Sequence, residues 1–166
     1  MKKTISTEST RANIAQVIAL LADTPGKLDS LSAQFQHEQF RKPLGLGERS
    51  FTEVLAHLIH CEARSSEAIY LALLQEEPLL AEVHPERQWG KLLRFDLLDF
   101  SDLLVYFRLR RAVLSRVLRS LKERQWERAI RAEGKKREES VYWLARSLAV
   151  HELEHLSELE EKLSVE

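Results

Sequence analysis

Four long segments of the chain repeat apolar residues at helical spacing and contain few glycines or prolines. They are residues 7–35, 50–76, 99–122 and 140–163. Side chains three and four positions apart share one face of a helix, so each segment predicts an amphipathic helix with one buried face. Thr24 and Pro25 predict a restart or a kink within the first segment, because Thr is a common N-cap and Pro a common first helical residue. The pattern therefore predicts an all-α fold, a four-helix bundle that spans residues 1–166 as one domain.

Long connections join these helices. The first covers residues 36–49 and leads into Ser-Phe-Thr-Glu at residues 50–53, which has the spacing of a capping box and marks a helix start. The second, residues 77–98, carries apolar residues. We expect it to fold back on the protein, either as a lid over a pocket mouth or as a cover for the end of the bundle. The third, residues 123–139, contains a charged run and predicts a polar surface link.

Composition narrows the class of protein. The chain has 166 residues, a formal net charge of -1 and one cysteine, Cys61. So small a net charge provides no basic field for nucleic acid, and a single cysteine excludes an intrachain disulfide and a cysteine-based zinc site. No apolar run approaches the roughly 20 residues that span a bilayer, and residues 1–6 lack the apolar core of a signal peptide. We expect a cytoplasmic protein that binds neither nucleic acid nor a membrane.

Two histidines near the C-terminus are spaced to bind a metal ion together. His151 and His155 are four residues apart in the sequence His-Glu-Leu-Glu-His, so they lie one turn apart on the same face of a predicted helix. Both belong to the inward seam of that helix. The seam consists of Leu144, Leu148, His151, His155 and Leu159. Two neutral imidazoles at this spacing form a clamp for a divalent cation. The alternative is a pair of partly exposed histidines on a polar helix.

The second predicted helix carries two further histidines, which the pattern separates. Small side chains share the stripe through His57, and the main apolar stripe of the helix borders it. His57 therefore points to the interior, where its small neighbours leave room for a cavity. The alternative is a core histidine that is hydrogen-bonded to a carbonyl group or to a neighbouring helix. Charged residues, including Arg64 and Glu67, share the stripe through His60, which predicts a solvated face.

Together, His57, His151 and His155 form a candidate metal site built from two helices. Three protein ligands leave coordination positions open for water or substrate, as in catalytic sites. Imidazole nitrogen suits Zn, Ni, Fe, Mn or Co, and the sequence does not distinguish among these metals. A bound ion would lower the pKa of a water molecule or a thiol and so produce a nucleophile near neutral pH. We interpret Cys61, one turn from His57, as a small core residue beside the pocket rather than a ligand.

Charged residues near these histidines are candidates for supporting roles. Glu152, Glu154 and Glu158 could each orient an imidazole, although a solvated helix face accounts for most acidic residues of this kind. One of the arginines within residues 99–122 could enter the pocket and hold an anionic group of a substrate. The stems of the other arginines would cover apolar surface.

Two motifs resemble the DinB/YfiT-like family. One is Phe-Thr-Glu-Val-Leu-Ala-His-Leu at residues 51–58, followed by Glu62, and the other is His-Glu-Leu-Glu-His-Leu at residues 151–156. The resemblance covers nearly the whole chain. It implies a four-helix bundle, a divalent metal on the three histidines selected above, and a homodimer. Relatives include metal-dependent transferases and isomerases that use low-molecular-weight thiols.

We therefore expect a metal-dependent enzyme that acts on a small-molecule substrate. The resemblance favours thiol-dependent transfer first and hydrolysis second. The opposing hypothesis is a non-catalytic, stress-linked binding or assembly bundle in which the metal is structural or absent. Removal of a structural metal would lower the melting temperature substantially, whereas removal of a catalytic metal from a self-sufficient bundle would change it little.

Overall fold

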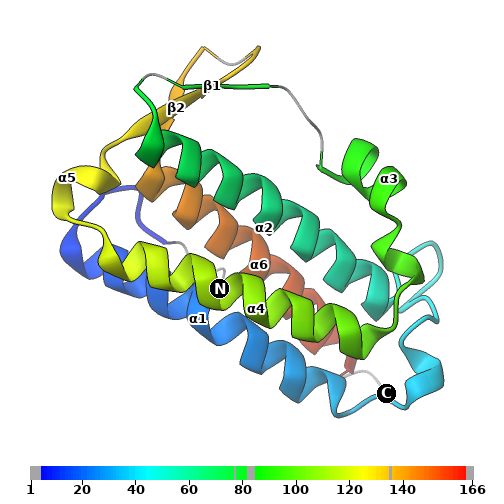
Figure 1. Cartoon of the computed structure of the whole chain (residues 1–166). Helices are drawn as coiled ribbons and strands as arrows, with labels where there is room; N and C mark the ends of the chain where they lie inside the picture. Colours follow the sequence, from blue (N-terminus) through cyan, green and yellow to red (C-terminus); the bar gives the residue numbers. More distant parts are fainter. Residues whose placement is uncertain (1–4, 77, 82–84, 135, 164–166) are drawn as a thin grey trace.

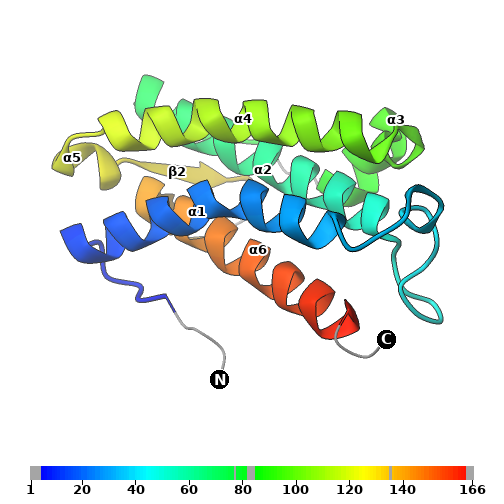
Figure 2. The ribbon, with the colours of Figure 1, turned by 90° about the horizontal axis from the view of Figure 1, so that it is seen from below.

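The structure, a computed structural model, describes residues 5–76, 78–81, 85–134 and 136–163. Its main elements are the long helices α1 Arg11–Ser32, α2 Phe51–Leu74, α4 Phe100–Ser120 and α6 Val141–Leu163. α1 packs against α4 and α6, and α2 packs against the same two helices, so α1 and α2 lie diagonally across the bundle (Figures 1 and 2). The predicted four-helix bundle is confirmed. Within the described ranges, no helix has the length and apolar character that a membrane span requires.

Short polar signals start the helices near the predicted positions. The Ser50 side chain accepts a hydrogen bond from the Glu53 amide at 3.2 Å, and the Glu53 carboxylate accepts one from the Ser50 amide at 2.7 Å. This capping box satisfies two amide groups that have no helical partner at the start of α2. Thr10 caps α1 with its side chain. At its other end α2 stops at Leu74, before Pro78, as the sequence predicts.

The first helix runs without interruption through Pro25, so of the predicted restart or kink at this point the restart is wrong. Proline has no amide hydrogen, and the Leu21 carbonyl therefore lacks the helical partner that residue 25 would normally supply. Arg111 of α4 donates a hydrogen bond to this carbonyl instead. The Thr24 hydroxyl lies 2.9 Å from a carboxylate oxygen of Glu152 on α6. The Thr-Pro pair is thus an attachment point for two neighbouring helices.

A layer of polar residues divides the core of the bundle into two apolar clusters. The cluster next to the strands includes Leu21, Ile69, Leu114 and Leu148. The cluster at the other end of the bundle includes Leu28, Leu55, Phe107 and Leu156. Between the clusters each long helix contributes a polar residue that is at most 2% exposed. These residues are Thr24, Glu62, Arg111 and Glu152.

Arg111 holds the polar layer together. Its guanidinium donates hydrogen bonds to Glu62 Oε2 and to Glu152 Oε2, each at 2.9 Å, and it makes further hydrogen bonds to both carboxylates. Burial raises the pKa of Glu62, and the positive charge of Arg111 opposes that rise. Although burial disfavours the charge of Arg111, the two carboxylates raise its pKa, so the guanidinium remains charged. The layer is therefore a buried ionic cluster that joins α2, α4 and α6 and, through Leu21 and Thr24, α1.

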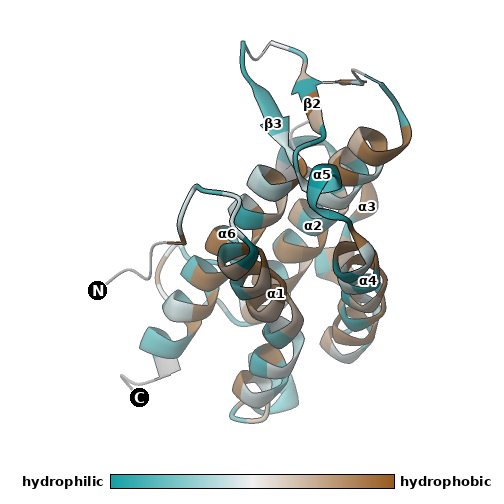
Figure 3. Cartoon of the chain, turned by 90° about the vertical axis from the view of Figure 1, so that its left-hand side faces the viewer, coloured by the Kyte–Doolittle hydropathy of each residue, from teal (hydrophilic) through white to brown (hydrophobic). Residues whose placement is uncertain are grey.

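A small sheet, which the sequence did not predict, joins two of the connections. Its strands, in spatial order, are β1 Leu79–Leu80, β2 Ala129–Ala132 and β3 Glu138–Ser140. β1 pairs with β2 in parallel and β2 pairs with β3 antiparallel. Figure 3 shows β2 and β3 beyond one end of the helices, with hydrophilic residues on β3. Strands this short leave no clear alternation of apolar and polar residues in the sequence.

The connection before α4 packs along the outer side of α2. It comprises the π-helical turn η2 Pro85–Gly90 and the short helices α3 Lys91–Leu93 and η3 Phe95–Leu97 (Figure 1). The Phe95 ring stacks on the ring of His60 with centroids 5.0 Å apart and planes inclined by 20°. The remaining short elements are η1 His37–Gln39 and α5 Glu123–Trp126. The connection thus covers one face of α2.

Replacement of Arg111 by Met should destabilise the protein strongly. The variant leaves the carboxylates of Glu62 and Glu152 buried without their cation, and breaking a buried ion pair in this way costs about 3–5 kcal/mol. Urea unfolding measures the free energy of unfolding. Arg116→Met, at an exposed position of the same helix, should change it by less than about 0.5 kcal/mol. Equal stability of the two variants would show that the polar layer does not hold the helices together.

Candidate metal site

His57, His151 and His155 come together between α2 and α6. The centroid of the His57 ring lies 5.0 Å from the centroid of each of the other two rings, and the His151 and His155 centroids are 4.6 Å apart. The nearest pair of ring nitrogens, His57 Nε2 and His151 Nε2, is separated by 3.1 Å. All three side chains are partly buried. The structure therefore brings together the three histidines that the sequence selected, from segments about 100 residues apart along the chain.

The surroundings of His57 and His151 favour neutral imidazoles. Burial first, and then the nearby positive charge of Arg49 and the neighbouring histidines, lower the pKa of His57 to about 3. Burial first, and then His155, lower the pKa of His151. A neutral imidazole has a lone pair on one nitrogen, and that lone pair is what a metal ion binds. At neutral pH, His57 and His151 can therefore accept a cation without first releasing a proton.

The distance between the two Nε2 atoms fits a shared metal ion. At a metal–nitrogen distance of about 2.0–2.1 Å, adjacent ligand nitrogens stand roughly 3.0–3.4 Å apart, and the observed separation is 3.1 Å. A direct hydrogen bond between two neutral rings fits the same distance. Among the described residues, the buried Nδ1 atom of His151 has no hydrogen-bond partner. The protein groups around the imidazoles therefore do not satisfy the cluster completely.

Cys61 and His155 are the two candidates for a third ligand beside His57 and His151. The donor atoms of His57, Cys61 and His151 all lie within 4.8 Å of one another, and the Cys61 sulfur is 3.8 Å and 3.7 Å from the two ring nitrogens of His57. The His155 ring is as close to the His57 ring as the His151 ring is. Burial raises the pKa of the Cys61 thiol to about 11. Because a metal binds the thiolate, the surroundings of Cys61 oppose its use as a ligand more than those of a histidine do.

Of the three glutamates proposed to orient an imidazole, one contacts a histidine directly. Glu158 Oε2 lies 3.0 Å from His155 Nδ1, which directs the other ring nitrogen away from the carboxylate. Glu152 does not serve this purpose, because its carboxylate is bound by Arg111 in the polar layer. Glu154 is exposed.

His60 is buried, and the predicted solvated face is wrong. Its side chain is 4% exposed because the connection before α4 covers it and Phe95 stacks on its ring. Its Nε2 atom is buried and has no hydrogen-bond partner among the described residues. Periodicity within α2 could not reveal this burial, since the covering residues come from another part of the chain.

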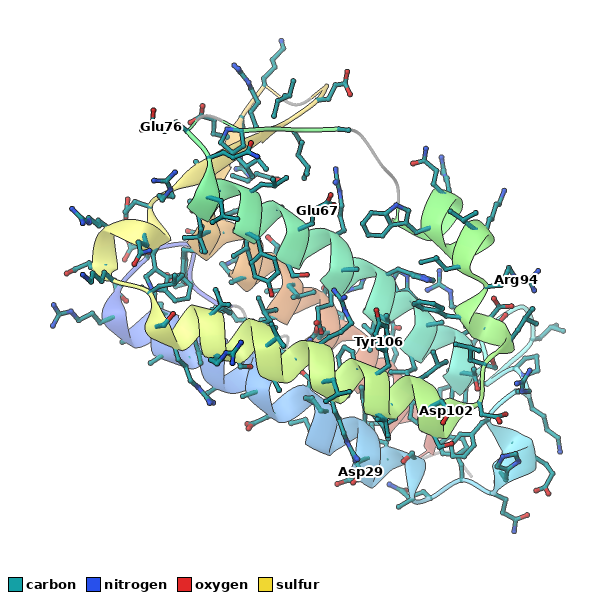
Figure 4. All side chains as sticks on the ribbon, viewed as in Figure 1. Asp29, Glu67, Glu76, Arg94, Asp102 and Tyr106 are labelled. Carbon is teal, nitrogen blue, oxygen red and sulfur yellow. The ribbon has the colours of Figure 1, made fainter. Side chains whose placement is uncertain are left out.

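Two cavities reach the histidines. One has a volume of about 350 Å³ and the other about 440 Å³. The first is lined by Arg49, Glu53, Ala56, His57, His60, Gly90, Lys91, Arg94 and Asp96. The second is lined by Leu44, Gly47, Glu48, Arg49, Val54, His155, Glu158, Leu159 and Lys162. The connection before α4 therefore forms a wall of the first cavity, and Figure 4 shows Arg94 on it at the end of α3.

Arg49 belongs to both cavities, and the sequence analysis missed it. The sequence predicts a pocket arginine within residues 99–122, where helical spacing indicates which side chains share a face. Arg111 of that segment is buried in the core, but carboxylates of the polar layer bind its guanidinium, so it does not line the cavities at the histidines. Arg49 lies in a connection without periodicity, and its only sequence signal is its place directly before the Ser50 cap.

Comparisons with known proteins agree with this architecture. The sequence profile of the DinB superfamily matches residues 20–159, which is most of the chain. A comparison with curated proteins gives no match. Among solved structures, YfiT from Bacillus subtilis is similar, with a TM-score of 0.84 at 19% sequence identity over 97% of this chain and 91% of that chain. YfiT is described as "a probable metal-dependent hydrolase with an unusual four-helix bundle topology". The shared bundle and the long match to the family profile show that the chain belongs to the DinB superfamily.

Proposed function

We propose that the protein is a metal-dependent enzyme in which His57, His151 and His155 bind one divalent ion. The observation that carries this proposal is the 3.1 Å approach of two ring nitrogens from different helices, with a third imidazole beside both. The lowered pKa values of His57 and His151 support it, because protons compete weakly for their lone pairs. His155 is the third ligand rather than Cys61, since Glu158 orients its ring and the Cys61 thiol is held neutral.

Three nitrogen ligands suit a catalytic role. They leave positions open for water or substrate, and Zn, Ni, Fe, Mn and Co are all compatible with imidazole. A bound ion would lower the pKa of a coordinated water molecule or thiol. The chain's own residues hold His57 and His151 neutral, fix the His155 ring through Glu158 and leave two cavities open beside the site.

The substrate is a small molecule, since the cavities at the histidines measure about 350 and 440 Å³. Thiol-dependent transfer is the first candidate reaction, with a low-molecular-weight thiol as co-substrate, because the two histidine motifs resemble relatives of that type. Hydrolysis is the second, and the description of YfiT favours it. In both reactions the nucleophile would bind the metal ion, as a water molecule in hydrolysis and as a thiol in transfer. The cytoplasmic location expected from the sequence stays a prediction.

The proposal includes a homodimer formed through α4. Val105, Leu109 and Val113 are four residues apart, share one face of the helix and are 54%, 63% and 46% exposed. A row of apolar side chains on the solvent side of a helix is typical of an interaction surface. Tyr106, labelled in Figure 4, lies on the same helix and is 41% exposed. A second copy of the chain is the partner that the family resemblance implies.

Replacement of His57, His151 or His155 by Ala should each abolish stoichiometric metal binding. Each variant removes one of three ligands and leaves too few to retain the ion. Elemental analysis of purified protein measures the metal content. His60→Ala and Cys61→Ala should retain the metal. Loss of metal in Cys61→Ala together with retention in His155→Ala would replace the three-histidine site by a site of His57, Cys61 and His151.

Chelation of the metal should abolish turnover while leaving the bundle folded. Activity is measured with ester substrates for hydrolysis and with electrophiles plus a low-molecular-weight thiol for transfer. Because the apolar core does not involve the ion, the melting temperature should fall by less than about 5 °C, equivalent to about 1–2 kcal/mol. Restoring the metal should restore activity in the wild type and not in His57→Ala. A fall of more than about 15 °C without any measurable turnover would favour the non-catalytic bundle with a structural metal.

Leu109→Glu should convert the dimer into a monomer. A carboxylate at the centre of the apolar row would be buried without a partner at the interface, which disfavours association. Sedimentation velocity measures the oligomeric state. Arg119→Glu, an exposed change on the same helix, should leave the dimer intact. A monomeric wild type, or a Leu109→Glu variant that remains dimeric, would contradict this interface.

A further inference from the structure

A third cavity lies between α1 and α4, which run side by side along the bundle (Figures 1 and 2). Its volume is about 590 Å³, which suits a small molecule. Small side chains, Ala22 and Pro25 on α1 and Ala112 on α4, line it and leave space between the two helices. The described lining of this α1–α4 cavity shares no residue with the cavities at the histidines, so the cavity is separate from the proposed metal site.

The charged residues of this lining are all arginines of α4, namely Arg108, Arg111, Arg116 and Arg119. Two of them are already matched by acids. Arg111 binds the carboxylates of the polar layer, and Arg108 pairs with Asp29 of α1, which is labelled in Figure 4. Arg116 and Arg119 are exposed and form no ion pair with any residue that the structure describes. The α1–α4 cavity therefore has two positive charges without an acidic partner in its described lining.

The placement of these two arginines is unfavourable in the protein alone. Arg116 and Arg119 are three residues apart on α4, a spacing at which like charges destabilise a helix. The helix dipole favours a cation in the last turn, which accounts for Arg119 but less well for Arg116, one turn earlier. By contrast, Arg11 on α1 has Glu123 at 3.3 Å. An anion between Arg116 and Arg119 would remove their repulsion.

Ser115 adds a hydroxyl group on the inner wall of the cavity. Its side chain is 7% exposed and lines the cavity, and its hydroxyl has no hydrogen-bond partner among the described residues. The hydroxyl of Ser120, also in the lining, instead donates to the Val117 carbonyl at 2.8 Å. A hydroxyl that is almost removed from water normally has a partner. Ser115 is four residues before Arg119 and so shares its face of the helix.

These donors suit a phosphate group better than a carboxylate. A guanidinium binds two oxygens of an oxyanion through parallel hydrogen bonds, and a serine hydroxyl donates one more. The two oxygens of a carboxylate are satisfied by a single guanidinium, whereas a phosphate monoester has three terminal oxygens for several donors. The net charge of -1 provides no field for a nucleic acid backbone, which leaves small phosphorylated molecules as the class of ligand.

We propose that the α1–α4 cavity binds the phosphate group of a small molecule through Arg116, Arg119 and Ser115. The two guanidinium groups hold the phosphate from the outer side, and the hydroxyl donates to it from the inner wall. This binding site goes beyond the proposed metal-dependent activity and does not depend on it.

The test uses phenyl phosphate as the probe and benzoate as its carboxylate counterpart. Isothermal titration calorimetry at constant ionic strength measures the affinity of the purified full-length protein for each. The variants are Arg116→Gln, Arg119→Gln and Ser115→Ala. Arg124→Gln is the matched control, because Arg124 is an exposed arginine that lines neither the α1–α4 cavity nor the cavities at the histidines.

The wild type should bind phenyl phosphate at least about 10-fold more tightly than benzoate. Arg116→Gln and Arg119→Gln should each weaken phenyl phosphate binding about 10- to 100-fold, the effect of losing hydrogen bonds to a charged group, and Ser115→Ala should weaken it about 3- to 10-fold. Arg124→Gln should stay within about 2-fold of the wild type. Circular dichroism checks that each variant is folded, and the exposed arginine variants keep the test valid if Ser115→Ala is destabilised.

Three results would overturn the inference. The first is a wild type that does not bind phenyl phosphate. The second is weakening by Arg124→Gln equal to that by Arg119→Gln, which would show that the probe responds only to net charge. The third is loss of phenyl phosphate binding in His57→Ala, which would place the phosphate at the metal site. Unchanged binding in His57→Ala supports a separate site, whether or not the protein proves to be a metal-dependent enzyme.

Discussion

The ionic contact between Arg111 and the buried carboxylates of Glu62 and Glu152 is the constraint on which the rest of the structure depends. Glu152 directly follows His151, and Glu62 follows His57 by five residues. When Arg111 fixes both carboxylates, the rotations of α2 and α6 are fixed as well, and the faces that carry the imidazoles are fixed with them. A buried ion pair contributes little net stability, but another register of the helices would leave its charges buried without their partners, which is unfavourable. The polar layer therefore acts mainly on register, and the two apolar clusters supply most of the free energy of folding.

The polar layer and the histidine cluster differ in how their charges are balanced. In the polar layer one cation is matched by two carboxylates and removed from water. At the histidine cluster, burial keeps His57 and His151 neutral, and Arg49 adds a positive charge at the open side. In the first arrangement Glu62 Oε1 has no hydrogen-bond partner but lies 3.6 Å from the Arg110 guanidinium, whereas the second has buried nitrogens on His151 and His60 without hydrogen-bond partners among the described residues. This contrast separates the part of the core that holds the fold from the part that is open to ligands.

Features that depend on spacing within one helix were predictable from the sequence. Apolar periodicity predicted the helices, and the four-residue spacing of His151 and His155 placed their rings on one face. Features that depend on distant parts of the chain were not predictable in this way. The residues that cover His60 lie in a connection, and Arg49 itself lies in another, so helical periodicity predicts neither the burial of His60 nor the position of Arg49. The choice between His155 and Cys61 as third ligand depends on side-chain orientation, which periodicity does not determine.

The proline within α1 has a consequence for how the bundle is completed. A residue with an amide hydrogen at position 25 would be a better helix former, but it would occupy the Leu21 carbonyl that Arg111 uses. At this position the stability of the isolated helix and the stability of the assembled bundle are in conflict, and the sequence favours assembly. The first helix is left with a carbonyl whose protein partner, Arg111, is supplied only when the helix packs against α4, so this hydrogen bond belongs to the tertiary structure.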